Sequence, residues 1–194
     1  MTIEVLELLK ITLPSLFTFL AGYIGYRYAL AQLKAQKKID FYIRQLNDFY
    51  SPLLGCRNEI LSKSELRLKI HYAADEAWRE KSKRLDEIQS DKNRDDSFEP
   101  YKKIIEYNNN QLKEELIPNY KRMLKIFTDN YWLAEPETRK WYSELAKFIE
   151  IWERSLSNSM PNEVVEKIGH DEKKLNGFYE DLEKHIDIIR MKLE

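Results

Sequence analysis

The sequence predicts an all-α protein in which an N-terminal transmembrane helix continues into an antiparallel cytoplasmic helix bundle. Its 194 residues contain only five glycines and six prolines, under half of the roughly 12% that Gly and Pro make up in soluble proteins. There are also only three valines, whereas strands depend on β-branched side chains and sheets on turn glycines. A sheet is therefore excluded by composition. A third observation, an uncharged segment near the N-terminus, predicts the membrane helix.

This uncharged segment has the length of a membrane span. No charged residue lies between Ile11 and Tyr26, and low polarity continues to Leu33. A helix over residues 14–33 would be about 30 Å long, which matches the hydrocarbon core of a bilayer. Its first residue is a proline, and a proline suits the first turn of a helix. We therefore expect residues 11–33 to form a transmembrane helix.

Basic residues around this segment predict its orientation. Only Lys10 precedes it, together with two glutamates, whereas several basic residues lie at its far end. The positive-inside rule then places residues 1–10 outside and residues 34–194 in the cytoplasm. A long basic side chain near the end of a span can reach the headgroups. The expected membrane-interface anchors are Arg27, Lys34, Lys37 and Lys38.

Two alternatives remain for this segment. Ala29-Leu30-Ala31 resembles the cleavage site of a signal peptide, although the basic region that such a peptide needs is missing from the first ten residues. The segment could also be a buried core helix of a soluble protein.

One face of the expected span carries small and polar residues, and the opposite face carries leucine and isoleucine. Small residues let helices approach closely in lipid, so this stripe suits packing against other copies of the chain. The same residues could line a narrow pore in an oligomer. Gly and Ser are also common in membrane helices in general. The stripe consists of Ser15, Thr18, Ala21, Gly22, Gly25, Ala29 and Gln32.

The helices of the bundle follow from apolar spacing and from the prolines. No Gly or Pro lies between Gly25 and Pro52, so we expect the membrane helix to continue into the cytoplasm. Ser51-Pro52 is expected to end it and to start a second helix that reaches about Ser90. A charged loop without apolar anchors is expected over residues 90–97.

The remaining helices are expected after this loop. A third helix begins near Phe98 and is kinked or ended by Pro118. Pro136 opens a fourth, and a fifth covers residues 162–193, with an early break at Gly169. Short connections between these helices favour an antiparallel bundle.

Motifs that carry catalysis are missing from the sequence. It has no phosphate-binding or dinucleotide-binding glycine loop, no HExxH and no CxxC. A single cysteine, Cys56, can form neither an intrachain disulfide nor a cysteine-rich zinc site. The i, i+4 pairs Glu166/His170 and Asp181/His185 each supply only two metal ligands. We therefore assign no catalytic, cofactor-binding or metal-binding residue, expect no cofactor, and expect a protein that is not an enzyme.

Arg67 and His71 resemble the Arg/His motif of the all-helical HEPN ribonucleases. That family separates the two residues by four to six positions, whereas three separate them here. The sequence therefore argues against a nuclease, and we expect His71 to pack beside Trp78 on the inner face of its helix.

The charge balance excludes a general nucleic-acid coat, because the formal net charge is −1. Local basic groups would still form a cationic ring if the chain oligomerised, and such a ring suits an anionic ligand such as a nucleotide or a short nucleic acid. Nearby acidic residues favour ordinary solvated helix faces instead. The possible anionic-ligand face consists of Arg79, Lys81, Lys83, Arg84, Lys121, Arg122 and Lys125.

Aromatic residues gather between positions 131 and 152. At helical spacing such a cluster favours a bundle core over a base-stacking or cation-binding cage. The cluster consists of Tyr131, Trp132, Trp141, Tyr142, Phe148 and Trp152.

Two segments, QLNDFYSPLLG (Gln45–Gly55) and NYWLAEPETRKWYSELAKFIEIWERSL (Asn130–Leu156), resemble a group of uncharacterised bacterial proteins. These have one N-terminal membrane helix and a helical cytoplasmic domain. The resemblance implies a single-pass protein of the bacterial inner membrane. Proteins of this build often act as effectors in anti-phage defence, where an oligomer breaches the membrane, although architecture alone transfers no functional residues.

Two functions are therefore expected from the sequence. In the first, the protein is an oligomeric, pore-forming membrane effector: its cytoplasmic domain senses a ligand or a partner, and its N-terminal helices form or gate a pore. In the alternative, it is a non-enzymatic membrane-anchored scaffold that docks a cytosolic protein. The expected partners are the lipid bilayer, other copies of the chain, and either an anionic ligand or that cytosolic protein.

Overall fold

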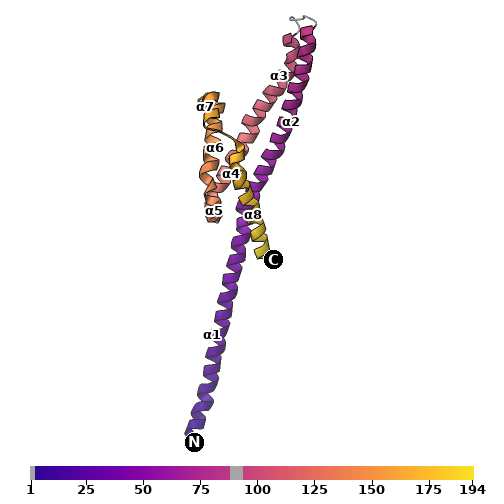
Figure 1. Ribbon diagram of the computed structural model, residues 1–194. Helices are drawn as coiled ribbons and strands as arrows, with labels where there is room; N and C mark the ends of the chain where they lie inside the picture. The colour runs from indigo at the N-terminus through magenta and orange to yellow at the C-terminus, as the bar shows by residue number, and fades with distance from the viewer. Residues whose placement is uncertain (1–2, 88–93) are drawn as a thin grey trace. The chain divides into compact units, whose positions relative to one another are not determined.

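The computed structural model describes residues 3–87 and 94–194, without the side chains of residues 3–13, 15, 87, 94 and 162. Every regular element in these residues is a helix, so the prediction of an all-α protein is confirmed (Figure 1). The chain divides into two compact units. One contains α1 (Ile3–Arg44), and the other runs from Gln45 to Lys192.

The helix α1 makes up the first unit. It begins at Ile3, so Pro14 lies inside the helix, and the expectation that Pro14 is the first helical residue is wrong. It continues well past Leu33, as the absence of Gly and Pro after Gly25 predicts. Among the described residues, no helix combines the length and the apolar character needed to cross a membrane. The expected span begins at residues 11–13 and 15, whose side chains lie outside the described part of the structure.

Two short π-helices interrupt the α-helical hydrogen bonding, and each ends two residues before a proline. The first, η1 (Gln45–Tyr50), precedes Pro52, and the second, η3 (Leu112–Leu116), precedes Pro118. A proline donates no backbone hydrogen bond, and its ring crowds the carbonyl four residues earlier. A wider π turn is one way to relieve that crowding without leaving the helix. The prediction that a second helix starts at Ser51-Pro52 is confirmed, because α2 (Ser51–Glu87) begins at Ser51. The expected end of the preceding helix at this point is wrong, because η1 keeps the chain helical up to α2.

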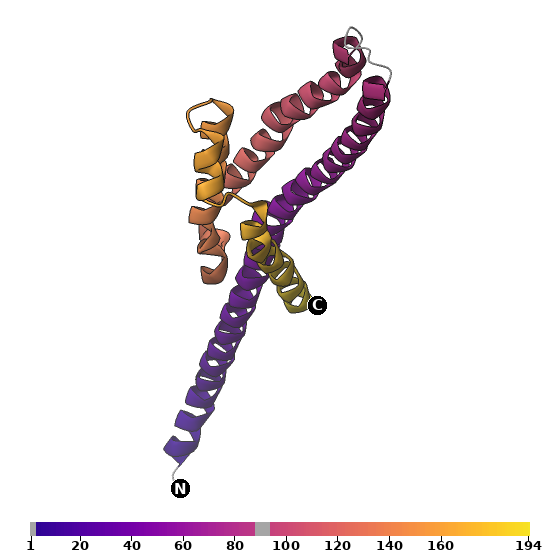
Figure 2. The ribbon, with the colours of Figure 1, turned by 45° about the horizontal axis from the view of Figure 1, so that its top comes forward.

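The core of the second unit is a helical bundle. It is built from η1 and the first ten residues of α2, together with α4 (Ile117–Asp129), α6 (Trp141–Leu156) and α8 (Asn176–Leu193) (Figures 1 and 2). Each fully buried large apolar side chain stabilises the fold by roughly 1.5–3 kcal/mol. The largest of these are Phe49, Tyr50, Leu53, Ile60, Met123, Phe127, Leu145, Phe178 and Leu182.

The later part of α2 pairs with α3 (Arg94–Gln111), and the two helices lie close together where α2 ends and α3 begins (Figures 1 and 2). None of the described side chains of α2 after Ile60 is fully buried. The Trp78 ring packs 4.9 Å from the ring of Phe98 and 5.4 Å from that of Tyr101, measured between centroids. The loop predicted over residues 90–97 ends earlier than expected, because α3 already begins at Arg94. Residues 88–93 lie outside the described residues.

Shorter elements connect the remaining helices. They are η4 (Tyr131–Leu133), α5 (Pro136–Arg139), α7 (Asn162–Lys167) and η5 (Glu172–Leu175). Pro136 opens a helix as predicted. The predicted break at Gly169 is also confirmed, since this residue has a φ of 61° after the end of α7, a conformation that glycine adopts readily.

Candidate functional site

Two polar side chains on the small-residue stripe of α1 form hydrogen bonds within the helix itself. The Thr18 hydroxyl donates to the carbonyl of Pro14 at 2.8 Å, and the Gln32 amide donates to the hydroxyl of Tyr28 at 3.0 Å. Such internal bonds reduce the energetic penalty of placing these groups in apolar surroundings. The side chain of Ser15, which also belongs to the predicted stripe, lies outside the described residues.

The stripe leaves open space beside its glycines. A Cβ atom added at Gly22 or Gly25 would meet no atom within 4 Å. A shallow depression next to them is lined by Thr18, Phe19, Gly22, Tyr23 and Tyr26. A second helix could therefore approach this face closely.

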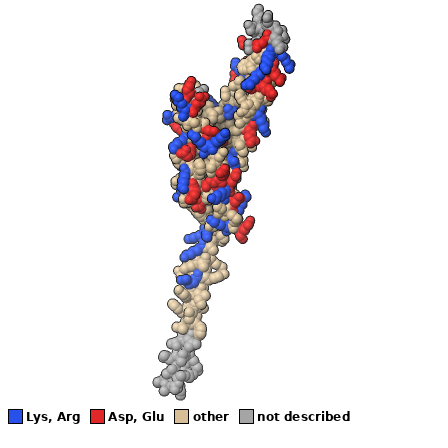
Figure 3. Space-filling model, in the orientation of Figure 1, with Lys and Arg blue, Asp and Glu red and all other residues tan. Residues whose placement is uncertain are grey.

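Large apolar side chains on α1 are exposed. In Figure 3, where tan marks every residue other than Lys, Arg, Asp and Glu, the part of this helix next to the grey residues is tan, and basic residues follow towards its C-terminal end. The four predicted interface anchors, including Lys34 and Lys38, are all exposed, and the Lys38 ammonium lies 5.8 Å from the centroid of the Tyr42 ring. The exposed apolar side chains include Leu16, Phe17, Phe19, Leu20, Tyr23, Ile24, Tyr26, Tyr28 and Leu33.

The predicted anionic-ligand face is distributed over two helices. Arg79, Lys81, Lys83 and Arg84 lie on the later part of α2, whereas Lys121, Arg122 and Lys125 lie on α4. Basic and acidic side chains alternate on the visible face of the second unit (Figure 3).

Several of these basic groups have acidic partners. Arg79 pairs with Asp75 at 2.8 Å and Lys125 with Asp129 at 2.8 Å, and Lys121 pairs with Glu153. Within the chain these acidic partners offset much of the positive charge.

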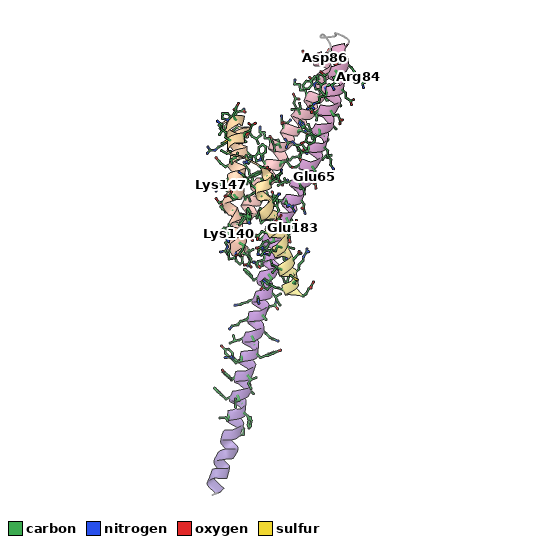
Figure 4. The ribbon with its side chains drawn as sticks, viewed as in Figure 1. Glu65, Arg84, Asp86, Lys140, Lys147 and Glu183 are labelled. Atoms are coloured by element: carbon green, nitrogen blue, oxygen red, sulfur yellow. The ribbon has the colours of Figure 1, made fainter. Side chains whose placement is uncertain are left out.

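A cavity of about 400 Å³ with both polar and apolar lining lies between α2, α3 and the start of η5. The volume of this cavity lies in the range of small-molecule sites. Glu65, labelled in Figure 4, directly follows the lining residue Ser64 on α2. The lining residues are Ser64, Arg67, Leu68, His71, Ile105, Asn108, Asn109 and Glu172.

Arg67 differs from the other half-buried arginines of the described residues. Arg57 pairs with Glu183 and lies over the Tyr179 ring, and Arg139 donates to the carbonyl of Ala134 at 2.8 Å. No ion pair or hydrogen bond to any described residue satisfies the Arg67 guanidinium. Burial lowers the pKa of this guanidinium below its ordinary value, because the charged form loses hydration.

Asn108 is a buried amide in the same cavity, with 6% of its surface exposed. The other two buried polar side chains each form at least one hydrogen bond: the Gln45 amide nitrogen donates to the Leu133 carbonyl at 2.7 Å, and the Thr138 hydroxyl donates to Asp181 at 2.6 Å. The Oε1 atom of Gln45 has no partner among the described residues. Among the described residues, the Asn108 side chain has no hydrogen-bond partner. Its amide atoms are not fully enclosed, since they border the cavity, so they are available to a molecule that enters it.

A smaller cavity of about 90 Å³ adjoins the first, since Ser64, Arg67 and Glu172 line both. The Tyr120 hydroxyl donates to the Glu172 carboxylate at 2.5 Å, and burial raises the pKa of Tyr120 well above its ordinary value. His170 also lines this smaller cavity, and its buried Nε2 has no hydrogen-bond partner among the described residues.

The cavity is only partly visible in the sequence. Ser64, Arg67 and His71 follow the i, i+3, i+7 spacing of one helix face, and this spacing could have indicated a shared wall. Glu172 is the first residue of η5, and only the path of the chain after α7 brings it to the cavity, so helical spacing could not have indicated it. The expectation that His71 packs beside Trp78 is wrong, because His71 is exposed and lines the cavity. In this part of α2, packing against α3 alone leaves no described side chain fully buried.

The predicted aromatic core is confirmed only in part. Phe148 is buried, and Trp141, Tyr142 and Trp152 are half-buried. Tyr131 and Trp132 are exposed, and the Arg139 guanidinium lies 5.3 Å from the centroid of the Tyr131 ring.

The fold and the cavity define a class of protein: an all-α chain with a helical bundle and a cavity of small-molecule size. Comparisons with family models, with curated proteins and with solved structures gave no match.

Proposed function

We propose that this chain is a single-pass protein of the bacterial inner membrane that acts as an oligomeric effector. Residues 11–33 of α1 enter the bilayer, and residues 34–194 form the cytoplasmic part. The observation that carries the proposal is the exposure of large apolar side chains along α1, such as Phe17 at 62% and Phe19 at 78%. Such a row of exposed apolar groups marks a surface that binds lipid or protein.

Basic residues next to the exposed apolar side chains of α1 favour lipid over protein as the partner of this surface. The apolar row is followed by Lys34, Lys37 and Lys38, which favour the cytoplasmic headgroups. The hydroxyl of Thr18 and the amide of Gln32 already have partners within the helix, so they enter lipid at a reduced penalty.

Contact between copies of α1 is supported by the open face at Gly22 and Gly25. In lipid, helices associate through close backbone approach rather than through hydrophobic burial. The glycine face then meets a second copy, and the leucine and isoleucine face meets lipid. In the effector, a signal received by the bundle changes this packing and opens a path along the stripe, in keeping with the resemblance to membrane effectors of anti-phage defence.

Membrane insertion is tested on the full chain by fractionation and flotation with liposomes. The wild type should float with the lipid, whereas Leu20→Arg combined with Ile24→Arg should not, because two charges near the centre of a span are costly. A wild-type chain that stays out of the lipid fraction would overturn the proposal.

Oligomer formation and conduction are tested with Gly22→Leu, which fills the open face. This variant should lower the oligomeric fraction and the depolarisation of the inner membrane on induction. Ile24→Leu, on the opposite face and of equal volume, should change neither. Replacing residues 11–33 by an unrelated leucine-rich helix separates the scaffold alternative, since a scaffold keeps its activity after the exchange and a pore-former loses it.

A further inference from the structure

We propose that the cavity between α2, α3 and η5 binds a small phosphomonoester, with the Arg67 guanidinium as its main anion contact. This inference rests on the second unit alone and holds whether or not α1 enters a membrane. This site for an anionic ligand differs from the one predicted from the sequence, which consists of basic residues on the surfaces of α2 and α4.

The state of Arg67 is the first step of the argument. A half-buried guanidinium without a counter-ion is unfavourable in the free protein, since hydration is lost and nothing replaces it. Arg57 and Arg139, which are similarly half-buried, both have partners. An anion that enters the cavity supplies what Arg67 lacks, and the planar guanidinium offers parallel donors to phosphate oxygens.

The number of donors on the wall favours phosphate over carboxylate. The Ser64 hydroxyl and the amides of Asn108 and Asn109 line the same cavity as Arg67. Together these groups offer more hydrogen-bond donors than the two oxygens of a carboxylate can use. A phosphomonoester has three terminal oxygens. The buried Asn108 amide, which lacks a protein partner, obtains one from the ligand.

The other lining groups describe the rest of the ligand. The Glu172 carboxylate accepts from Tyr120 and has capacity for a further donor, such as a sugar hydroxyl. Leu68 and Ile105 add an apolar wall. A phosphate at one end, a hydroxyl-bearing middle and a flat or apolar end match a nucleoside monophosphate, and the volume of about 400 Å³ is sufficient for one.

The experiment uses the detergent-solubilised full chain and follows thermal unfolding by tryptophan fluorescence. The probes are AMP, inorganic phosphate and succinate, each compared with sodium chloride at equal ionic strength. AMP should raise the unfolding temperature most and phosphate less, whereas succinate should act like chloride. Calorimetric titration with AMP then gives the affinity.

Arg67→Gln should weaken AMP binding at least about 30-fold, as expected when one partner of a buried charged contact is removed. Without ligand, the same variant should unfold at an equal or higher temperature than the wild type, because it removes an unpaired half-buried charge. A purely structural role of Arg67 would give the opposite change. Arg79→Gln, on the same helix but exposed and paired with Asp75, is the matched control and should bind AMP within about twofold of the wild type.

Asn108→Asp is the second test variant, since a carboxylate at this buried position repels phosphate. It should weaken AMP binding at least as strongly as Arg67→Gln. The proposal is overturned if AMP stabilises the wild type no more than chloride does, or if Arg67→Gln binds AMP as the wild type does. Equal stabilisation by succinate and AMP would overturn the assignment of a phosphate ligand.

Discussion

The hydroxyl of Tyr50 lies 3.1 Å from Oγ1 of Thr138, so that the end of η1 is joined to α5 inside the bundle. Thr138 donates its own proton to Asp181 of α8 at 2.6 Å, so Tyr50 donates to Thr138. The Tyr50 oxygen in turn accepts from the backbone N–H of Glu135 at 3.1 Å. Burial raises the pKa of Tyr50 to about 12, which keeps this donor protonated. Three helical elements far apart in the sequence are thereby joined through one hydroxyl chain.

From these hydrogen bonds we expect two substitutions to lower the free energy of unfolding by different amounts. Thr138→Val should lower the free energy of unfolding by about 2–3 kcal/mol, because it leaves the buried donor of Tyr50 and an oxygen of Asp181 unpaired. Tyr50→Phe should lower it by about 1 kcal/mol, since Thr138 keeps its bond to Asp181. Urea unfolding measures both.

The double variant Tyr50→Phe with Thr138→Val is the control. It should be less destabilised than the sum of the two single variants, because both remove the same bond. Simple additivity would show that the two hydroxyls do not interact in solution.

Gly177 predicts a clash at the start of α8. A Cβ atom at this position would lie 2.7 Å from Cη2 of Trp141. Overpacking of this kind costs about 1–3 kcal/mol, more than the helix propensity that alanine adds. Gly177→Ala should therefore lower the unfolding free energy by about 1 kcal/mol.

Two controls separate the clash from the backbone effect. Gly55→Ala in α2, where the added Cβ meets nothing within 4 Å, should raise the unfolding free energy by about 0.5–1 kcal/mol. In a Trp141→Leu background, Gly177→Ala should become stabilising. A destabilisation that persists in this background would contradict the assignment of the clash to the ring.

His170 predicts a pH dependence of stability. Burial lowers the pKa of this imidazole, with Lys174 adding to the effect and Asp171 opposing it. The unfolded chain therefore takes up a proton at higher pH than the folded chain does. The contribution of His170 is present above about pH 6.5 and is lost as the pH falls towards the lower folded value.

The measurement is the loss of unfolding free energy between about pH 7.5 and 5.5. This loss should be smaller in His170→Phe, whose ring also suits the contacts with Phe148 and Trp152. An equal loss in the wild type and in this variant would assign the pH dependence to other groups.

Cys56 should react slowly with thiol reagents in the native protein. Its side chain is only 3% exposed, and burial raises the pKa of the thiol, so that little reactive thiolate is accessible. Modification by iodoacetamide should become complete only on unfolding. Asn58→Cys combined with Cys56→Ala places a thiol at an exposed position two residues away and should react rapidly. Similar rates for the two proteins would contradict the burial of Cys56.

The prolines and glycines of the sequence were sufficient to predict much of the helical order. Pro136 and Gly169 mark a helix start and a helix break as expected, since each restricts or frees the backbone locally. Ser51-Pro52 marks the start of α2 as expected, but no break precedes it, because a π turn absorbs the missing hydrogen bond and the chain stays helical. The spacing of apolar residues did not reveal that α2 leaves the bundle core after Ile60, because burial depends on how many helices surround a segment.

By itself the sequence determined the all-α class, since the scarcity of Gly, Pro and β-branched residues acts at every position through local backbone preference. It also located the small-residue stripe with Gly22 and Gly25, which depends only on the helical period. Only the tertiary structure decided that Arg67, which has no ion pair to a described residue, lines one cavity together with Asn108 and Glu172. The physical reason is that the partners of a buried polar group come from segments distant in the chain, and periodicity carries no information about which segments meet.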